Sequence, residues 1–213
     1  MILDERTAAF IHSFDPELPE YLYNLEQSAK REDVPIIRKD MQMLLRFLMK
    51  ERKPQMILEV GTAVGFSALL MSEYAPADCK ITTIEKYEKR IPVALENFSK
   101  FGKQNRINLI AEDAADVLKR LEPPYDFIFM DAAKGQYFHF LEDVIRLLPI
   151  GGMLVSDNVL QDGEIIESRF AVTRRNRTIH ARMREYLYVL THNACLETVI
   201  LPVGDGITIS IKK

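Results

Sequence analysis

Apolar residues recur at three- and four-residue intervals along the first fifty residues. Two groups have this spacing: Leu18, Tyr21, Leu22 and Leu25, then Met41, Leu44, Leu45 and Leu48. Such a stripe of apolar positions predicts an amphipathic helix. Pro35 lies between the two groups, and a proline there discourages one continuous helix. We therefore expect a helical extension over residues 1–50.

After residue 55 the pattern changes to short, almost continuous apolar runs that alternate with helical stretches. Five such runs occur, at residues 56–60, 81–84, 107–110, 127–130 and 153–156. Runs of this kind are typical of a parallel sheet that helices cover on both faces. Two further strands are expected at 198–201 and 207–211, and the short connection 202–206 joins them as an antiparallel hairpin. The pattern predicts an α/β fold in a single domain, residues 1–213, with its core at residues 55–213.

Composition and charge narrow the possible classes of protein. Hydrophobic residues make up 47% and charged residues 28% of the chain, which excludes a disordered or collagen-like protein. The longest stretch without a charge, residues 60–72, is too short for a membrane helix. Charged residues at positions 4–6 argue against a secretory signal, and the two cysteines form no closely spaced pair. We expect a cytoplasmic protein with no membrane partner.

A glycine-containing turn follows the first expected strand. Gly61 and Gly65 allow the backbone to turn sharply and to approach a ligand closely. Glu85 ends the second strand, where a carboxylate can accept hydrogen bonds from ribose hydroxyls. Together these residues favour an adenosine-type cofactor, although the glycines alone are also compatible with a simple tight turn. Asp113, after the third strand, is a candidate either for an adenine contact or for a helix cap. The dinucleotide pattern GxGxxG is absent because Ala63 replaces its second glycine.

Polar residues follow the fourth and fifth strands. Asp131 ends one and Asp157-Asn158 ends the other. Because ligands of open α/β sheets bind outside the carboxyl ends of the strands, these side chains are expected to converge beside the cofactor. Two carboxylates and an amide oxygen suit Mg²⁺ or Ca²⁺ better than zinc. Lys134 is a candidate general base, since the positive charge of a metal ion bound nearby would favour the neutral form of its amine. The alternative is that both acids cap turns at strand ends.

These motifs together resemble the cation-dependent O-methyltransferases, the family of catechol and caffeoyl-coenzyme A methyltransferases. The segments that carry the resemblance are residues 58–63, 131–137, 156–159 and 201–206. The resemblance implies a Rossmann-like class I methyltransferase fold with a seven-stranded, mostly parallel sheet whose last strand is antiparallel. It also implies S-adenosylmethionine as cofactor, bound by Glu59, Gly61, Thr62, Gly65, Ser67, Glu85, Asp113, Ala114 and Asp131. The same family implies Mg²⁺ or another divalent cation on Asp131, Asp157 and Asn158, with Asp131 and Lys134 as catalytic residues.

A basic segment follows the fifth strand. Residues 169–184 contain six arginines, at positions 169, 174, 175, 177, 182 and 184, and no acid. Because the segment comes directly after Asp157-Asn158, we expect it to border the active site. Such a border suits the phosphates of RNA or of coenzyme A. The alternative is a solvated surface whose arginines pair with acids such as Glu164 and Glu167.

Within the family, the short chain, residues 131–137 and the arginines resemble most the bacterial tRNA 5-hydroxyuridine methyltransferases. This implies the tRNA anticodon loop as partner and 5-hydroxyuridine at the wobble position as substrate. Arg174, Arg175, Arg177 and Tyr137 are the predicted RNA contacts, and Phe138, Phe66 and Tyr186 are further aromatic candidates for stacking on the base. Leu187 departs from the family, which often has an asparagine there.

Three functions follow from these observations. The first is a tRNA-modifying O-methyltransferase. The second is an O-methyltransferase of small catechols or caffeoyl-coenzyme A-like phenolic substrates. The third is a non-catalytic nucleotide- or RNA-binding module. Family members commonly form dimers, so a homodimer is expected.

Overall fold

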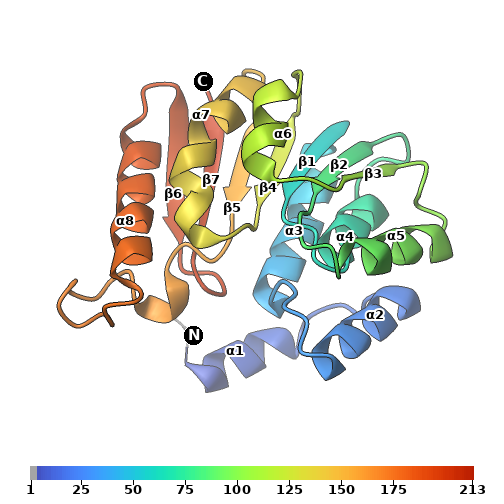
Figure 1. The fold of residues 1–213 in the computed structure, drawn as a ribbon. Coiled ribbons are helices and arrows are strands. Elements are labelled where there is room, and N and C mark those ends of the chain that lie inside the picture. The colour runs from blue at the N-terminus through green and yellow to red at the C-terminus, as the bar shows by residue number, and fades with distance from the viewer. Residues whose placement is uncertain (1–3) are drawn as a thin grey trace.

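The strands predicted from the sequence assemble into one seven-stranded sheet. The computed structural model describes residues 4–213, so residues 1–3 of the expected extension lie outside the described residues. The strands are β1 (Met56–Val60), β2 (Lys80–Ile84), β3 (Ile107–Ile110), β4 (Phe127–Met130), β5 (Met153–Ser156), β6 (Leu196–Leu201) and β7 (Ile207–Lys212). Their order across the sheet is β3-β2-β1-β4-β5-β7-β6 (Figure 1).

The register of the sheet brings the ends of four strands to one edge. The first five strands are parallel, and Val60 at the end of β1 pairs with both Ile84 of β2 and Met130 of β4. Met130 in turn pairs with Ser156, the last residue of β5. Strand β7 is antiparallel to both of its neighbours, β5 and β6. The predicted α/β fold class, with its antiparallel last strand and terminal hairpin, is confirmed.

Helices cover both faces of the sheet, as predicted. They are α1 (Glu5–His12), α2 (Glu20–Arg31), α3 (Lys39–Arg52), α4 (Phe66–Tyr74), α5 (Ile91–Lys100), α6 (Ala114–Arg120), α7 (Tyr137–Leu147) and α8 (Arg177–His192), with short 3₁₀ turns η1 (Lys134–Gln136) and η2 (Gln161–Gly163). Apolar residues of α3, α4 and α5 form one core with the sheet, and those of α6, α7 and α8 form a second core on the opposite face (Figure 1).

The N-terminal helices are anchored below the edge of the sheet where the strands end (Figure 1). Glu26 of α2 is 1% exposed and lies 3.0 Å from the ammonium groups of both Lys30 and Lys39. Its carboxylate also accepts a hydrogen bond from Gln42 of α3. This buried pairing fixes α2 against α3, and the connection between them, residues 32–38, is thereby held close to the functional edge.

Within residues 4–213, every helix is too short or too polar to cross a membrane.

Candidate functional site

The turn after β1 packs directly on the backbone that carries Asp131. Gly61 has φ +103°, and a Cβ at this position would lie 2.1 Å from the carbonyl oxygen of Asp131. Gly65 has φ +85°, and a Cβ there would lie 2.4 Å from the ring of Phe98. Both glycines are therefore required by a positive φ and by a close approach. The sequence left open whether the glycines make only a tight turn or also bring the backbone close to a ligand. In the structure one tight turn meets both descriptions, because Gly61 also lines the cavity.

Glu85 is held rigidly at the end of β2. Its carboxylate accepts hydrogen bonds from the backbone N–H groups of Ala63 (2.8 Å), Lys86 (3.0 Å) and Tyr87 (2.8 Å). A carboxylate has about four acceptor positions, so capacity remains for a ligand hydroxyl. The Glu85–Ala63 bond also joins the end of β2 to the glycine turn, which fixes the two parts of the site relative to each other.

Glu59 supports the turn from behind. It is fully buried, and the hydroxyls of Thr83 and Ser67 hydrogen-bond to its carboxylate. Burial raises the pKa of Glu59 to about 7. Thr62 is also buried and shares a hydrogen bond with Thr83. The side chains of Glu59 and Thr62 therefore order the turn from within the protein.

Asp113 caps α6, which is one of the two roles left open by the sequence. Its carboxylate accepts a hydrogen bond from the N–H of Ala115 at 2.9 Å. The ammonium group of Lys86 lies 2.9 Å from the same carboxylate and, with the cap, lowers the pKa of Asp113. Lys86, Asp113 and Ala114 all line the cavity described next, so the cap is compatible with a cofactor contact.

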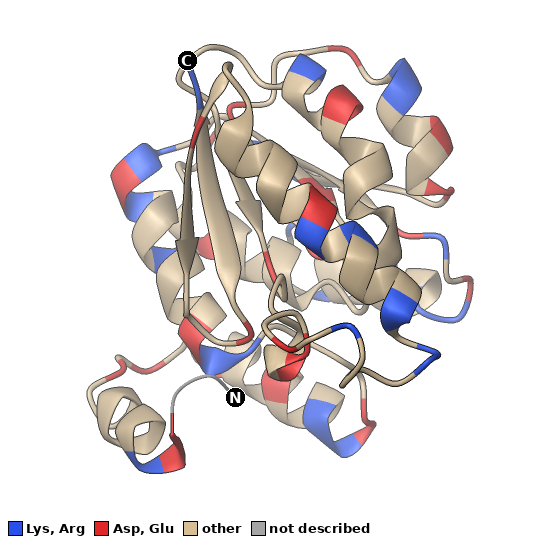
Figure 2. Ribbon diagram, turned by 90° about the vertical axis from the view of Figure 1, so that its left-hand side faces the viewer, with Lys and Arg blue, Asp and Glu red and all other residues tan. Residues whose placement is uncertain are grey.

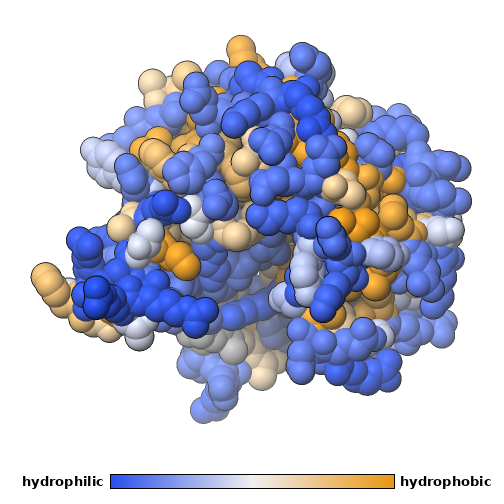
Figure 3. Space-filling view, in the orientation of Figure 1, coloured by the Kyte–Doolittle hydropathy of each residue, from blue (hydrophilic) through white to orange (hydrophobic). Residues whose placement is uncertain are grey.

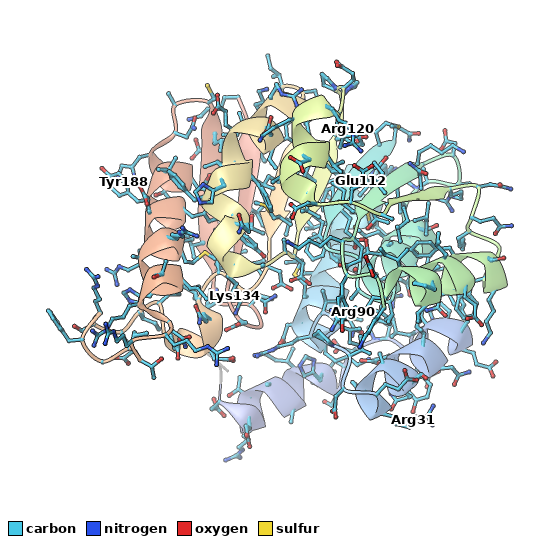
Figure 4. All side chains as sticks on the ribbon, in the orientation of Figure 1. Arg31, Arg90, Glu112, Arg120, Lys134 and Tyr188 are labelled. Carbon is cyan, nitrogen blue, oxygen red and sulfur yellow. The ribbon has the colours of Figure 1, made fainter. Side chains whose placement is uncertain are left out.

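A cavity of about 540 Å³ lies along this edge of the sheet. Seven of the nine predicted cofactor-binding residues line it: Gly61, Thr62, Ser67, Glu85, Asp113, Ala114 and Asp131. Glu59 and Gly65 lie behind the lining. The segment Pro35–Arg38 closes one side. The face shown in Figure 3 is hollowed here, and Figure 4 shows Lys134 and Arg90 on opposite sides of the opening.

Asp131, Asp157 and Asn158 come together at the other end of the site. The amide nitrogen of the Asn158 side chain donates to Asp131 at 3.1 Å, and the Asn158 backbone N–H donates to Asp157 at 2.7 Å. Asp157 is only 4% exposed. Burial raises the pKa of both acids, and the charge of Asp131 raises the pKa of Asp157 further. A buried carboxylate next to a second one that lines the cavity favours a bound cation, which would balance their charges.

The donor set fits a hard divalent cation. Within residues 4–213, no group of three or more His, Cys, Asp or Glu side chains is arranged to bind a metal. The two carboxylates and the Asn158 amide oxygen would hold the ion, with water or substrate oxygens completing its coordination. This is the oxygen-only chemistry of Mg²⁺ or Ca²⁺ sites, and it disfavours zinc. Asn158 has φ +58°, an uncommon conformation that is frequent at functional sites.

Lys134 belongs to a chain of charged groups that the sequence did not predict. Its ammonium group lies 3.3 Å from the carboxylate of Asp205, which is 2% exposed. Asp205 also accepts a hydrogen bond from the backbone N–H of Asp162, whose side chain pairs with Arg38 at 2.8 Å. The motif 201–206 marked this hairpin, but it gave Asp205 no role. Arg38, which lines the cavity, stands in no recognisable motif.

The structure corrects the prediction for the aromatic residues. Tyr137 and Tyr186 are both 0% exposed and pack against each other with ring centroids 5.4 Å apart. Tyr137 therefore cannot stack on a substrate base, because its ring is enclosed by core residues. Leu187 is packed against the same core. Phe66 is among the residues that line the cavity, but it is only 1% exposed and belongs to the core, and Phe138 is partly exposed outside the lining.

The arginine segment touches the turn that carries Lys134 through Arg182, but none of residues 169–184 lines the cavity. Within residues 4–213, none of its six arginines forms an ion pair with a carboxylate, and Arg169, Arg174 and Arg175 are exposed. Figure 2 shows Lys and Arg positions in blue along the loop before α8 and on that helix. Arg182 donates to the carbonyl of Gly135 at 3.1 Å, which links α8 to the turn that carries Lys134. Glu164 instead accepts hydrogen bonds from Asn176 and Gln161. The expected pairing of these arginines with Glu164 or Glu167 is therefore absent from residues 4–213, whereas the exposure of three of them agrees with a solvated surface.

Comparison with known proteins identifies the family of the chain. The sequence model of the O-methyltransferase family matches residues 12–213. A caffeoyl-CoA O-methyltransferase of Stellaria longipes is 33% identical over 174 residues, which cover 78% of this chain and 71% of that protein. The Tapetum-specific methyltransferase 1 of Arabidopsis thaliana is 30% identical, covering 80% and 75%. The SAH-bound structure of a Podospora anserina methyltransferase is 26% identical and covers 98% of this chain and 94% of its own, with a TM-score of 0.89. The chain belongs to the O-methyltransferase family.

Proposed function

We propose that this O-methyltransferase transfers the methyl group of S-adenosylmethionine to the hydroxyl of 5-hydroxyuridine at the wobble position of tRNA, with the help of a divalent cation. The observation that carries the proposal is the single cavity that Glu85 lines at one end and Asp131 and Asn158 at the other. Such a cavity can hold a nucleoside cofactor and an acceptor hydroxyl next to each other. Its volume of about 540 Å³ is in the range of small-molecule sites.

The cofactor is assigned to the end of the cavity at β1 and β2. Glu85 would accept hydrogen bonds from the ribose hydroxyls, and the Asp113-Ala114 cap would lie beside the adenine. The glycine turn at Gly61 leaves room for the amino-acid part of the cofactor. The Podospora anserina relative binds SAH on the same fold, which supports this assignment.

The cation is assigned to Asp131, Asp157 and Asn158. When bound, it would supply Lewis acidity that favours ionisation of the acceptor hydroxyl, and a template that orients the acceptor. The protein's own contribution is to keep the three ligands rigid. The hydrogen bonds of Asn158 to both acids provide this rigidity.

Lys134 is assigned as the general base. The acceptor oxygen forms a bond to the methyl carbon while the carbon–sulfur bond breaks, and Lys134, in its neutral amine form, accepts the hydroxyl proton and becomes the ammonium that pairs with Asp205. Asp205 fixes the position of that nitrogen. Alignment of the reacting atoms by fixed groups can supply several kcal/mol of the rate enhancement, on the order of 7–11 in favourable cases.

The unpaired arginines support a polyanionic acceptor. Arg174 and Arg175 are exposed, and Arg177 follows them at the start of α8. Positive side chains that no acid neutralises can contact phosphates, and each such contact adds to the salt dependence of binding. Arg182 connects this surface to the Lys134 turn. An anticodon loop could therefore bind across the arginines and present its wobble base to the cavity.

The comparisons favour a second candidate acceptor, a small phenol or its coenzyme A ester. The Stellaria longipes relative is a caffeoyl-CoA O-methyltransferase. Coenzyme A also carries phosphates, so the arginines fit it as well. The two acceptors differ in the number of phosphates engaged: binding of an anticodon loop would fall more steeply with salt than binding of an ester.

We also infer a homodimer in solution. Phe10 of α1 and Phe14, just after that helix, are 65% and 72% exposed, and Phe47 of α3 is 65% exposed. Large exposed aromatic side chains are typical of interaction surfaces. Sedimentation analysis of the wild type and of Phe47→Asp tests this inference, and a monomeric wild type at micromolar concentration would contradict it.

The proposed reaction can be tested with labelled S-adenosylmethionine, Mg²⁺ and tRNA that contains unmethylated 5-hydroxyuridine. Mass spectrometry of the nucleosides should show 5-methoxyuridine, and EDTA or Asp157→Ala should abolish it. Asp78→Ala is the matched control, because it removes an exposed acid before β2, at the opposite edge of the sheet. Methylation that persists in Asp157→Ala would disprove the metal assignment. Methylation of caffeoyl-CoA but not of tRNA would show that the acceptor is the coenzyme A ester and not 5-hydroxyuridine.

A further inference from the structure

The hydroxyl of Tyr137 binds backbone groups on both strands that lead to the proposed metal ligands. Tyr137 is the first residue of α7 and is completely buried. Its hydroxyl oxygen lies 3.1 Å from the carbonyl oxygen of Met130 and 3.0 Å from that of Asp157, so its one O–H is shared between these two acceptors. The same oxygen takes part in a backbone hydrogen bond with Ala132. One side chain therefore contacts the residues before and after Asp131, and Asp157 itself.

These contacts lie at the carboxyl ends of β4 and β5, where the regular ladder stops. The N–H of Asp157 donates to the carbonyl of Met130 at 3.0 Å, and the N–H of Asp131 donates to the carbonyl of Val60 on β1 at 3.0 Å. These are the last backbone bonds that hold the two acids to their neighbouring strands. The Tyr137 oxygen adds a side-chain link between β4 and β5 at this point.

We propose that Tyr137 is a positioning residue that sets the separation of the Asp131 and Asp157 carboxylates for a divalent cation. The inference rests on the metal site of the proposed function. Metal affinity depends on how accurately the ligands are held, and groups that orient ligands typically change it by about 10- to 100-fold when they are removed. Tyr137 acts through the backbone of the ligand residues and has no contact with the ion.

Tyr186 provides a matched control for the loss of a buried hydroxyl. It is also 0% exposed, and its ring meets that of Tyr137 edge to face at 5.4 Å. Its hydroxyl, however, hydrogen-bonds to the side chain of Ser156 at 2.6 Å. Tyr186→Phe removes the same atom from the same core and leaves the bridge between Met130 and Asp157 in place.

The experiment measures Mn²⁺ binding by calorimetry in the presence of S-adenosylhomocysteine, which needs no turnover. We expect Tyr137→Phe to weaken Mn²⁺ binding about 10-fold or more, and Tyr186→Phe to change it less than twofold. Binding of S-adenosylhomocysteine without metal should stay within about threefold in both variants, because Glu85 and the Gly61 turn are untouched. In addition, 4-fluorophenylalanine at position 137 fills the volume of the hydroxyl without a donor, and 4-aminophenylalanine restores an N–H donor.

The outcomes separate this inference from the proposed function. Weak Mn²⁺ binding with phenylalanine or 4-fluorophenylalanine, and recovery with 4-aminophenylalanine, would support the positioning role. The fluoro and amino variants preserve core volume, so they decide the question even if Tyr137→Phe does not fold. If the variants with phenylalanine or 4-fluorophenylalanine at position 137 bind Mn²⁺ within twofold of wild type, the positioning role of Tyr137 is overturned but the metal site is not. Equal weakening of Mn²⁺ binding in Tyr186→Phe would have the same meaning. A wild-type protein that binds no Mn²⁺ would overturn the metal site as well.

Discussion

Replacing Gly61 by alanine should separate the cofactor turn from the strand that carries Asp131. The new Cβ would lie 2.1 Å from the carbonyl oxygen of Asp131, and 2.9 Å from its carbonyl carbon. Both are backbone atoms, so no side-chain rotation can relieve the contact. Either the Gly61 turn or the backbone at Asp131 must move, and both belong to the site.

The size of the effect has two parts. A residue with a Cβ at positive φ is destabilised by roughly 1–2 kcal/mol. Relief of the contact then requires a displacement of roughly 1 Å between the turn and Asp131, and a displacement of that size can reduce activity about 100-fold. We therefore expect Gly61→Ala to weaken S-adenosylhomocysteine binding and to reduce methyl transfer by about two orders of magnitude.

Gly151→Ala is the control for the conformational part alone. Gly151 has φ +78°, and a Cβ there would have no neighbouring atom within 4 Å. Gly151→Ala should lower the melting temperature by the amount that corresponds to a Cβ at positive φ, and it should leave the affinity for S-adenosylhomocysteine unchanged. Calorimetric titration with S-adenosylhomocysteine and thermal unfolding of both variants provide the measurements. The reasoning is refuted if folded Gly61→Ala binds the ligand within threefold of wild type.

Three further substitutions test separate parts of the site. Asp205→Asn keeps the size of the side chain but removes the ion pair that holds the Lys134 nitrogen in position, so steady-state kinetics should show a kcat at least about 10-fold lower with little change in the KM for the cofactor; an unchanged kcat would remove Asp205 from the mechanism. Arg175→Ala should lower tRNA affinity and reduce the slope of log affinity against log salt by about 1, whereas an unaltered slope would show that Arg175 contacts no phosphate. Burial raises the pKa of Glu59 to about 7 from 4.5, so its contribution to stability is fully present below about pH 4.5 and is lost as the pH rises through 7. The free energy of unfolding, measured with denaturant on metal-free protein, should therefore fall less between pH 4.5 and 7 for Glu59→Gln than for wild type, by up to about 3 kcal/mol. Parallel pH profiles of the two proteins would contradict this.

The sequence predicts the centre of the sheet well because β4 and β5 are buried along their whole length and β1 along most of it. Runs such as 127–130 have no polar alternation, so their length and spacing alone indicate parallel strands. The same property places Asp131 and Asp157 correctly, since the carboxyl ends of parallel strands meet at one edge. The predicted cofactor residues follow from the same rule, and most of them line the cavity.

The remainder of the site depends on contacts between distant segments. Asp205 meets Lys134 only because β7 is inserted between β5 and β6 and returns the hairpin to the active edge. Tyr137 was assigned to the substrate because an aromatic residue near a site suggests stacking, but the direction of its side chain depends on the packing of α7 on the sheet. Periodicity within α7 cannot show which buried hydroxyl reaches the strands.

The most direct test of the proposed function compares two acceptors under the same conditions. Initial rates of methyl transfer should be measured for tRNA with 5-hydroxyuridine and for caffeoyl-CoA, each with Mg²⁺ at low and at moderate salt. We predict a higher kcat/KM for the tRNA, with a steep decrease as salt rises, and no transfer to either acceptor after EDTA treatment. A higher kcat/KM for caffeoyl-CoA, or transfer that EDTA does not affect, would contradict the proposal.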